Sequence, residues 1–161
     1  MLPFRVITVF AFFLIVIGIG FGSTGSISEV SSAAPRPTPE HENKAMSDYR
    51  GIAIGMPTDD VRKKLGNPKD KSDATDLYTF SEDETAQFYY NATKNVTAIM
   101  ITFAGDLKNA PTPKSVFGED VEAKPDGSIF KMVRFPKAGF WISYNRTPSP
   151  DAIVNIAFQK M

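Results

Sequence analysis

Residues Val96 to Phe103 read VTAIMITF, and side chains of two different kinds alternate along this stretch. Successive side chains of a β-strand point to opposite faces of a sheet, so the even-numbered residues share one face and the odd-numbered residues the other. The odd-numbered face carries Ile99, Ile101 and Phe103. This period of two predicts a strand with one face turned to a core.

Two more strands are expected before this one, at Asp76–Phe80 and Thr85–Tyr90, which are rich in aromatic and other β-prone side chains. The short polar segments at residues 82–84 and 91–95 separate the three strands and are typical of turns. Residues 76–103 therefore predict an antiparallel meander of three strands.

A short helix is expected ahead of this meander, where residues 55–66 read GMPTDDVRKKLG. Thr58 is a good N-cap, because its hydroxyl can accept a hydrogen bond from the first turn. Val61 and Leu65 share one face and are expected to pack inward. Gly66 suits the left-handed position that ends a helix, and Pro68 prevents its continuation.

The same plan recurs in the second half of the chain. Residues 112–118 offer an N-cap in Thr112, a proline at the first helical position and a closing Gly118. Three further strands are then expected at Ile129–Phe135, Gly139–Tyr144 and Ile153–Gln159. The pattern predicts an α+β fold of two degenerate copies, each a helix and a three-stranded antiparallel meander, with the short helices packed on one sheet face.

Copy one is expected at residues 47–105 and copy two at residues 110–161. A chance likeness between two unrelated meanders is the alternative interpretation. The pattern leaves open whether the copies form one sheet or two.

The stretch Val6–Gly22 reads VITVFAFFLIVIGIGFG and contains no charged residue. Seventeen helical residues would span about 25 Å, which suits a short signal anchor or a cleaved signal peptide. Arg5 precedes the stretch, which favours an orientation that exports the rest of the chain. We expect residues 1–22 to be this anchor or signal peptide, with membrane contact through residues 6–22; a buried core helix is the alternative.

Residues 23–46 are rich in small residues, proline and scattered charge, and are expected to form a flexible linker. The only histidine, His41, lies in this segment, so a solvated linker residue is expected rather than a metal ligand. The folded domain is then expected at residues 47–161.

Composition narrows the classes of function. The chain has no cysteine, which excludes disulfides, thiolate metal sites and a lipid-modified N-terminal cysteine. Lys plus Arg and Asp plus Glu each number 18, so no net positive charge indicates nucleic-acid binding. No phosphate-binding loop, dinucleotide motif or nucleophile motif occurs. We therefore expect no catalytic residue, no metal and no cofactor.

Acidic residues of the expected loops offer the one enzymatic alternative. They are Asp70, Asp73, Asp76, Glu82, Asp83 and Glu84. A carboxylate pair could support acid–base chemistry, although nothing in the sequence selects such a pair. A solvated surface is the expected role of all six.

Aromatic side chains give the candidate binding residues: Tyr89, Tyr90, Trp141 and Tyr144. Alternation places Tyr89 and Tyr90 on opposite faces, so the four cannot all lie in one core. Aromatic side chains left on an exposed face would form a protein-binding patch. The alternative is that they pack in the core or at the junction of the two copies.

Gly55, Val61, Leu65, Pro68 and the two strands that follow them resemble the SmpA/OmlA (BamE-like) domain of the cell envelope. The likeness covers about residues 52–103, and the two-copy arrangement is similar to the tandem modules of the beta-lactamase-inhibitor-like superfamily. The resemblance implies an exported, non-catalytic protein that binds another protein. Members of that family are typically lipoproteins, and this chain lacks the cysteine that such anchoring requires.

We therefore expect a non-enzymatic, membrane-tethered binding or scaffold module, located on the extracytoplasmic side in the periplasm or at the cell surface. Its expected partner is another envelope protein. The alternatives are a secreted inhibitor-type binding protein, if the N-terminal segment is cleaved, and a carboxylate-dependent enzyme.

Overall fold

The computed structural model describes residues 45–148 and 150–161. The expected anchor or signal peptide at residues 1–22, and the expected linker apart from its last two residues, lie outside this part of the chain. Within the described part, no helix combines the length and apolar character that a membrane crossing needs.

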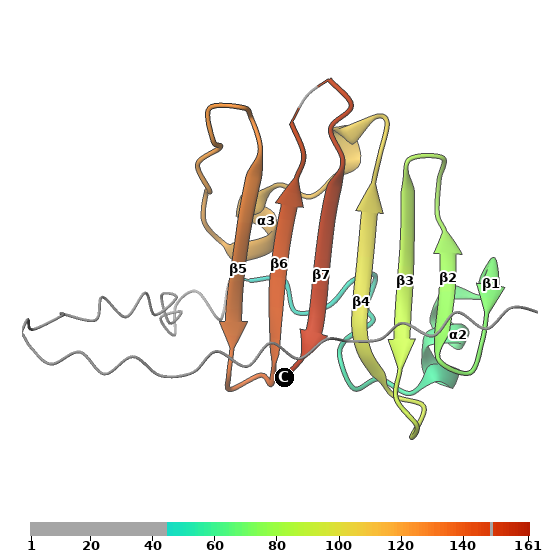
Figure 1. Ribbon diagram of the computed structural model, residues 1–161. Coiled ribbons are helices and arrows are strands. Elements are labelled where there is room, and N and C mark those ends of the chain that lie inside the picture. Colours follow the sequence, from blue (N-terminus) through green and yellow to red (C-terminus); the bar gives the residue numbers. More distant parts are fainter. Residues whose placement is uncertain (1–44, 149) are drawn as a thin grey trace, which may run out of the picture. The chain divides into compact units, whose positions relative to one another are not determined.

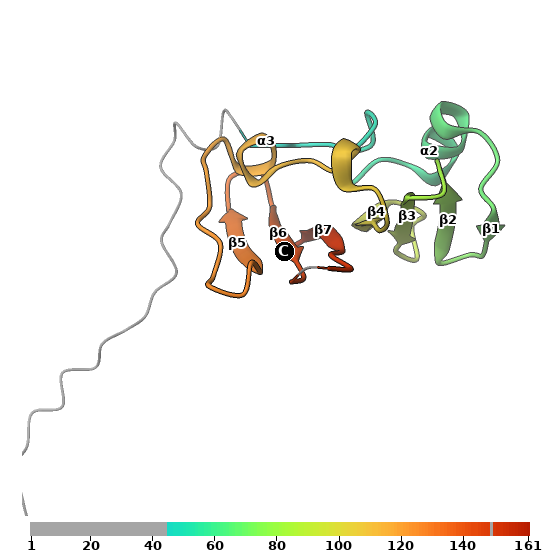
Figure 2. The same ribbon diagram turned by 90° about the horizontal axis from the view of Figure 1, so that it is seen from above.

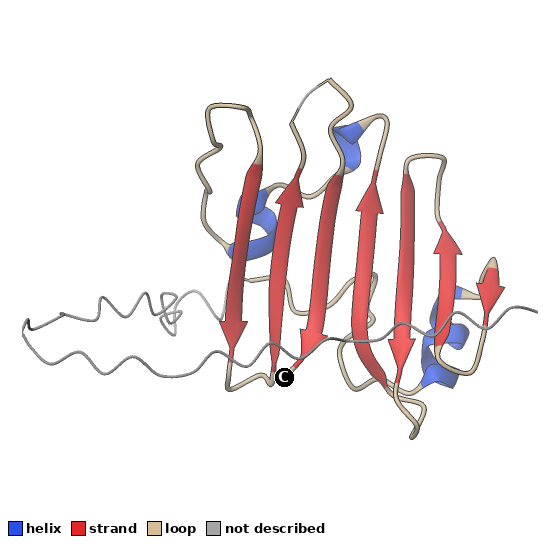
Figure 3. Ribbon diagram, viewed as in Figure 1, coloured by secondary structure: helices blue, strands red, loops and turns tan. Residues whose placement is uncertain are grey.

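Seven strands form one antiparallel sheet in the order β1-β2-β3-β4-β7-β6-β5 (Figures 1 and 3). Their bounds are Asp70–Lys71 (β1), Thr75–Thr79 (β2), Glu84–Tyr90 (β3), Val96–Phe103 (β4), Ile129–Phe135 (β5), Phe140–Arg146 (β6) and Val154–Lys160 (β7). The α+β class and the antiparallel sheet are thus as predicted.

The sheet consists of two meanders, β2-β3-β4 and β5-β6-β7, joined through the last strand of each. Ile99 of β4 pairs with Phe158 of β7, and Ile101 pairs with Ile156. Because the two last strands run side by side, neither is an edge of the sheet. Within the described residues the two meanders therefore form one continuous sheet, with β1 and β5 at its edges.

The strand bounds differ from the prediction mainly at the ends of strands. The predictions for β4 and β5 are confirmed, whereas β6 begins at Phe140 and runs on to Arg146, two residues beyond its predicted end. Strand β1 was not predicted, because two exposed residues carry no alternation to recognise. It pairs Asp70 with Leu77 at the edge of the sheet.

Helices α2 (Thr58–Leu65) and α3 (Pro113–Phe117) and the short 3-10 helix η1 (Leu107–Asn109) all lie on one face of the sheet (Figure 2). The segment before α2 crosses the same face. Its Met46 N–H donates to the Val116 carbonyl of α3 at 2.9 Å, and its Ile52 side chain is fully buried. The short helices therefore cover one face, as predicted.

The start of α3 is as predicted, and that of α2 is not. The Thr112 hydroxyl accepts from the Ser115 N–H at 3.2 Å, and Gly118 has the left-handed conformation that ends α3. At α2 the N-cap is Pro57, with no side-chain cap. The Thr58 hydroxyl donates instead to the Lys94 carbonyl at 2.9 Å, because the turn before β4 brings that acceptor within reach.

The hydrophobic core lies between the sheet and the elements that cover it. Alternation along β3 turns Ala86, Phe88 and Tyr90 toward this core. The Tyr78 ring packs edge-on against Phe88, with the ring centroids 5.5 Å apart. Ile99, Ile101 and Phe103 of β4 are buried in the same layer, so the prediction that they share a face is confirmed. Next to the irregularity between Tyr89 and Tyr90, Val96 is buried in place of Thr97, so the predicted face of Val96 is wrong.

Candidate functional site

The face of the sheet opposite the helices is not covered by any other described segment (Figure 2). Strand register identifies its side chains, because cross-strand partners in an antiparallel sheet share a face. The open face comprises Asp70 of β1; Thr75, Leu77 and Thr79 of β2; Thr85, Gln87 and Tyr89 of β3; Ala98, Met100 and Thr102 of β4; Asn155, Ala157 and Gln159 of β7; Trp141, Ser143 and Asn145 of β6; and Phe130, Met132 and Arg134 of β5.

The open face is almost free of charge. None of its side chains from β2, β3, β4, β7 or β6 is charged, and its two charged side chains, Asp70 of β1 and Arg134 of β5, stand at opposite edges of the sheet. Large apolar side chains are exposed there, with 61% of Phe130, 40% of Met100 and 38% of Met132 accessible to solvent. Protein interfaces are poor in charge at their centre and rich in aromatic residues and methionine, and this face has that composition.

Two of the four candidate residues, Tyr89 and Trp141, lie on the open face in one cross-strand row. Tyr89 of β3 pairs with Ala98, Ala98 pairs with Gln159, and Gln159 pairs with Trp141 of β6. Three strand spacings separate the two rings, about 14 Å between their backbones. Both side chains are half-buried, and the small Ala98 lies between them.

The other two candidates, Tyr90 and Tyr144, lie on the covered face, where they are 7% and 3% exposed. Each occupies an inward position of its strand, so alternation turns it toward the helices. The structure therefore does not bring the four residues together. Tyr90 and Tyr144 cannot contact a partner that binds the open face.

A buried polar network joins α2 to the sheet beneath it. Asp76 is fully buried, and Arg62 of α2 donates to both of its carboxylate oxygens, at 2.9 and 2.8 Å. The Tyr90 hydroxyl donates to the same carboxylate at 2.8 Å. Asp76 is the second residue of β2 and faces inward, so the expectation that it is a solvated loop residue is wrong.

Sequence reasoning missed this network, although one signal for it exists. Asp76 has the same parity as Tyr78 on β2, so the alternation that identifies Tyr78 as inward-facing also identifies Asp76. A buried carboxylate needs a partner, and Arg62 on the expected helix was available. Its position over β2 follows only from the packing of α2.

The alkaline limit of stability is expected to depend on Tyr90. Burial and the hydrogen bond to Asp76 raise its pKa well above the usual value of about 10. The unfolded chain therefore loses this proton above about pH 10 while the folded chain retains it. Its contribution to stability is complete below about pH 10 and is lost as pH rises, with a slope of up to about 1.4 kcal/mol per pH unit.

Urea unfolding between pH 8 and pH 11 tests this expectation, with the fluorescence of Trp141, the only tryptophan, as the signal. Tyr90→Phe should show a shallower loss of stability at high pH than the unchanged chain. Parallel curves for the two proteins would contradict the assignment.

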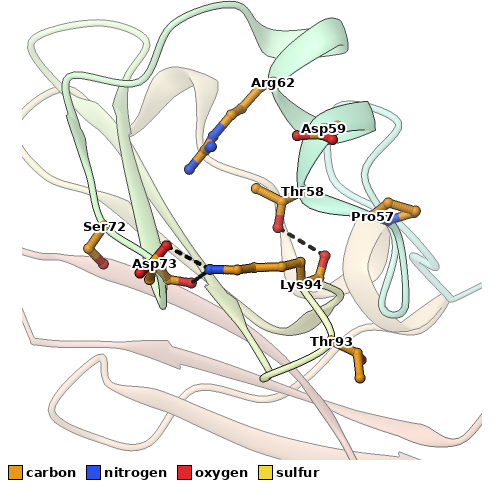
Figure 4. Close-up of a pocket in the computed structure, with 8 residues that line it drawn as sticks. All are labelled: Pro57, Thr58, Asp59, Arg62, Ser72, Asp73, Thr93 and Lys94. Atoms are coloured by element: carbon orange, nitrogen blue, oxygen red, sulfur yellow. Dashed lines mark hydrogen bonds and ion pairs between the residues drawn. The ribbon is translucent and has the colours of Figure 1, made fainter.

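A cleft of about 380 Å³ lies between α2 and the turns before β2 and β4 (Figure 4). It is lined by Pro57, Thr58, Asp59, Arg62, Ser72, Asp73, Thr93 and Lys94. Figure 4 shows Lys94 extended to Asp73, where its Nζ donates to the carboxylate at 2.7 Å and to the Asp73 carbonyl at 3.1 Å. The two cations of the cleft are thus already compensated, Arg62 by Asp76 and Lys94 by Asp73.

The hydrogen bond and the charge of Lys94 hold the pKa of Asp73 below its usual range. A general acid needs the opposite shift, a raised pKa that keeps its proton near neutral pH. The geometry of this cleft therefore does not favour the carboxylate-dependent enzyme.

Glu84 is a second acidic residue that was expected to be solvated but forms hydrogen bonds within the protein. It accepts hydrogen bonds from Tyr49 and from Arg50, whose Nη2 lies 2.8 Å from its Oε1. The Arg50 guanidinium in turn lies 3.9 Å from the centre of the Phe80 ring. These contacts fasten the segment before α2 to the β2–β3 hairpin, which is a structural role.

No group of three or more His, Cys, Asp or Glu side chains in the described residues is arranged to hold a metal ion. His41 lies outside these residues.

No protein-family model matches the sequence, and neither the curated proteins nor the solved structures contain a significant match to it.

Proposed function

We propose that this protein is a non-enzymatic binding or scaffold module, tethered to a membrane on the extracytoplasmic side, that binds another envelope protein through the open face of its sheet. The observation that carries the proposal is the row from Tyr89 to Trp141 on a broad face whose central strands bear no charge. Tyr and Trp are the side chains most often found at binding hot spots.

The dimensions of the open face support this role. Six strands, from β2 to β5, are separated by five spacings of about 4.8 Å, and their residues rise by about 3.4 Å each. The open-face residues span five positions of each strand, about 17 Å, so the face measures about 24 Å by about 17 Å, roughly 400 Å², before the side chains are added. A standard interface buries about 800 Å² on each partner, so this face is large enough to form the central part of an interface with one partner protein.

The resemblance to the SmpA/OmlA (BamE-like) domain supports the same class of function, and we propose that the two halves are degenerate copies of such a unit. Each half has a helix before a three-stranded meander, and the copies meet at β4 and β7. The uncharged stretch Val6–Gly22 supports the tether. A secreted inhibitor-type protein would have the same face without the anchor.

A photo-crosslinking residue placed at position 89 or 141 of the full chain, in its native membrane, should yield one discrete crosslinked product. The same residue at Ser115, which is exposed on α3 at the covered side, should not. Trp141→Ala and Tyr89→Ala should each weaken binding of the purified partner about tenfold or more, while Ser115→Ala leaves it unchanged.

If both variants fold and retain the affinity of the unchanged chain, the open face is not the binding surface. Mass spectrometry of the same preparation shows whether the N-terminal segment is retained as a membrane anchor or is cleaved. A peptide that contains Met1 or Leu2 supports an anchored protein, and a chain that begins near Ala34 supports a secreted one.

A further inference from the structure

A second cleft, of about 280 Å³, lies on the covered side where β6 ends and β7 begins. These two strand ends are at the top of the sheet in Figure 1. Its apolar walls are formed by Leu107, Pro111, Pro113 and Val154, and its polar side by Tyr144 and Arg146, so we call it the Tyr144–Arg146 cleft. It is separate from the open face, so inferences about it do not depend on the partner proposed above.

Arg146 is the last residue of β6 and makes no ion pair within the described part of the chain. Its Nε is buried, and it is the one buried side-chain nitrogen or oxygen of the described residues that has no hydrogen-bond partner. Arg146 as a whole is half-buried, but a buried N–H such as this one is normally paired, because an unpaired buried donor is costly. In contrast, Arg62 and Arg50, the other arginines of the covered side, are engaged by Asp76 and Glu84.

Tyr144 lies two residues earlier on the same face of β6 and is 97% buried, being 3% exposed. Its hydroxyl makes no hydrogen bond to any described residue. Burial raises the pKa of this hydroxyl, and the nearby charge of Arg146 partly opposes the rise. At neutral pH the hydroxyl keeps its proton and can donate it to an acceptor.

The cleft thus offers two kinds of donor that have no partner among the described residues: the terminal N–H groups of Arg146 and the hydroxyl of Tyr144. Adjacent guanidinium donors match the two oxygens of a carboxylate. Arg146 is the only charged side chain that lines the cleft, and a single positive charge matches a carboxylate better than a phosphate dianion. The volume is just below the range of ligand pockets and suits a ligand the size of one side chain.

We propose that the Tyr144–Arg146 cleft binds a carboxylate carried on an apolar body. Arg146 would hold the two oxygens, Tyr144 would donate to one of them, and Leu107, Pro111, Pro113 and Val154 would enclose the apolar part. The carboxylate can belong to a small organic acid or to the C-terminal residue of a polypeptide, since both present the same chemistry.

Benzoate and benzamide are the matched probes, because they have nearly the same shape and differ in charge. Ligand-observed NMR titration of the full chain in a mild detergent should show saturable binding of benzoate, and binding of benzamide at least about tenfold weaker. Equal binding of the two probes, or no binding of benzoate, would overturn the proposal.

Variants identify the donors. Arg146→Gln should weaken benzoate binding about tenfold, and Tyr144→Phe should weaken it less, because a charged hydrogen-bonded pair contributes more than a neutral donor. Arg134→Gln, which changes an exposed arginine on the open face, is the control and should bind benzoate as the unchanged chain does. Unchanged binding by Arg146→Gln would refute the assignment.

The stability of the same variants separates a binding role from a structural one. Arg146→Gln should melt at the same or a higher temperature, because it removes a buried donor that has no partner. Benzoate should raise the melting temperature of the unchanged chain and not that of this variant. If Arg146→Gln does not fold, Arg146→Lys retains the charge without the paired donors and should also lose benzoate affinity.

Peptides distinguish the two sources of the carboxylate, a small organic acid and the C-terminal residue of a polypeptide. A hexapeptide that ends in phenylalanine with a free carboxylate is compared with its C-terminal amide. A free peptide that binds at least tenfold more tightly than benzoate, with a weakly binding amide, assigns the cleft to a polypeptide terminus. A free peptide that binds more weakly than benzoate assigns it to a small organic acid.

Discussion

Replacing Arg62 by methionine is expected to lower the free energy of unfolding by about 3 to 5 kcal/mol at neutral pH. The reason is the partner that the variant leaves behind. Asp76 is completely buried, and Arg62 supplies two of its three side-chain hydrogen bonds, Tyr90 supplying the third. A buried carboxylate without its cation is costly, and methionine preserves much of the apolar packing of the arginine stem.

The matched control is Lys94→Met in the same cleft. Lys94 also forms a hydrogen-bonded ion pair, but its partner Asp73 is fully exposed and returns to water when the pair is broken. Exposed pairs contribute little, so this variant should unfold at nearly the same urea concentration as the unchanged chain. Equal losses of stability in the two variants would show that the contribution of the Arg62–Asp76 pair to the free energy of unfolding does not come from the burial of Asp76.

Replacing Phe88 by alanine is expected to cost about 3 to 5 kcal/mol of unfolding free energy. Its ring is fully buried beneath the covering elements and lies between Tyr78 and Tyr49, with centroids at 5.5 and 6.4 Å. Removing it takes apolar surface out of the core and leaves a cavity in the centre of the domain.

The neighbouring Tyr89→Ala is the control for this prediction, because it changes an aromatic residue one position along the same strand. Tyr89 points to the open face, where its hydroxyl donates to Gln87 at 2.6 Å, and its loss should cost about 1 kcal/mol or less. Urea unfolding of the two variants measures the difference. A loss for Tyr89→Ala as large as that for Phe88→Ala would mean that the open face is covered in the folded protein.

This pair of variants also bears on the proposed function. A side chain that contributes little to stability and lies on a wide, uncharged face is available to a partner, so an effect of Tyr89→Ala on binding can be separated from an effect on folding. Trp141 stands three strands away in the same row. Together they allow the open face to be tested at two points.

Much of the fold follows from local patterns in the sequence. The alternation at Val96–Phe103 predicted the strand β4 and the shared face of Ile99, Ile101 and Phe103, and Thr112 and Gly118 predicted the two ends of α3. These patterns are reliable because a strand or a helix turn is determined by residues two to four positions apart. The N-cap of α2 was predicted wrongly, since the Thr58 hydroxyl found its acceptor at Lys94, 36 residues away.

What the sequence determined by itself is therefore the order of helices and strands, the residues that share each strand face, and the absence of thiol chemistry. The tertiary structure alone decided which face the helices cover, and with it that Tyr89 and Trp141 are accessible while Tyr90 and Tyr144 are not. It also decided that Asp76 is buried against Arg62 and that Arg146 is left without a partner. Such outcomes depend on contacts between residues far apart in the chain, and their energies depend on exclusion of water, which no local pattern records.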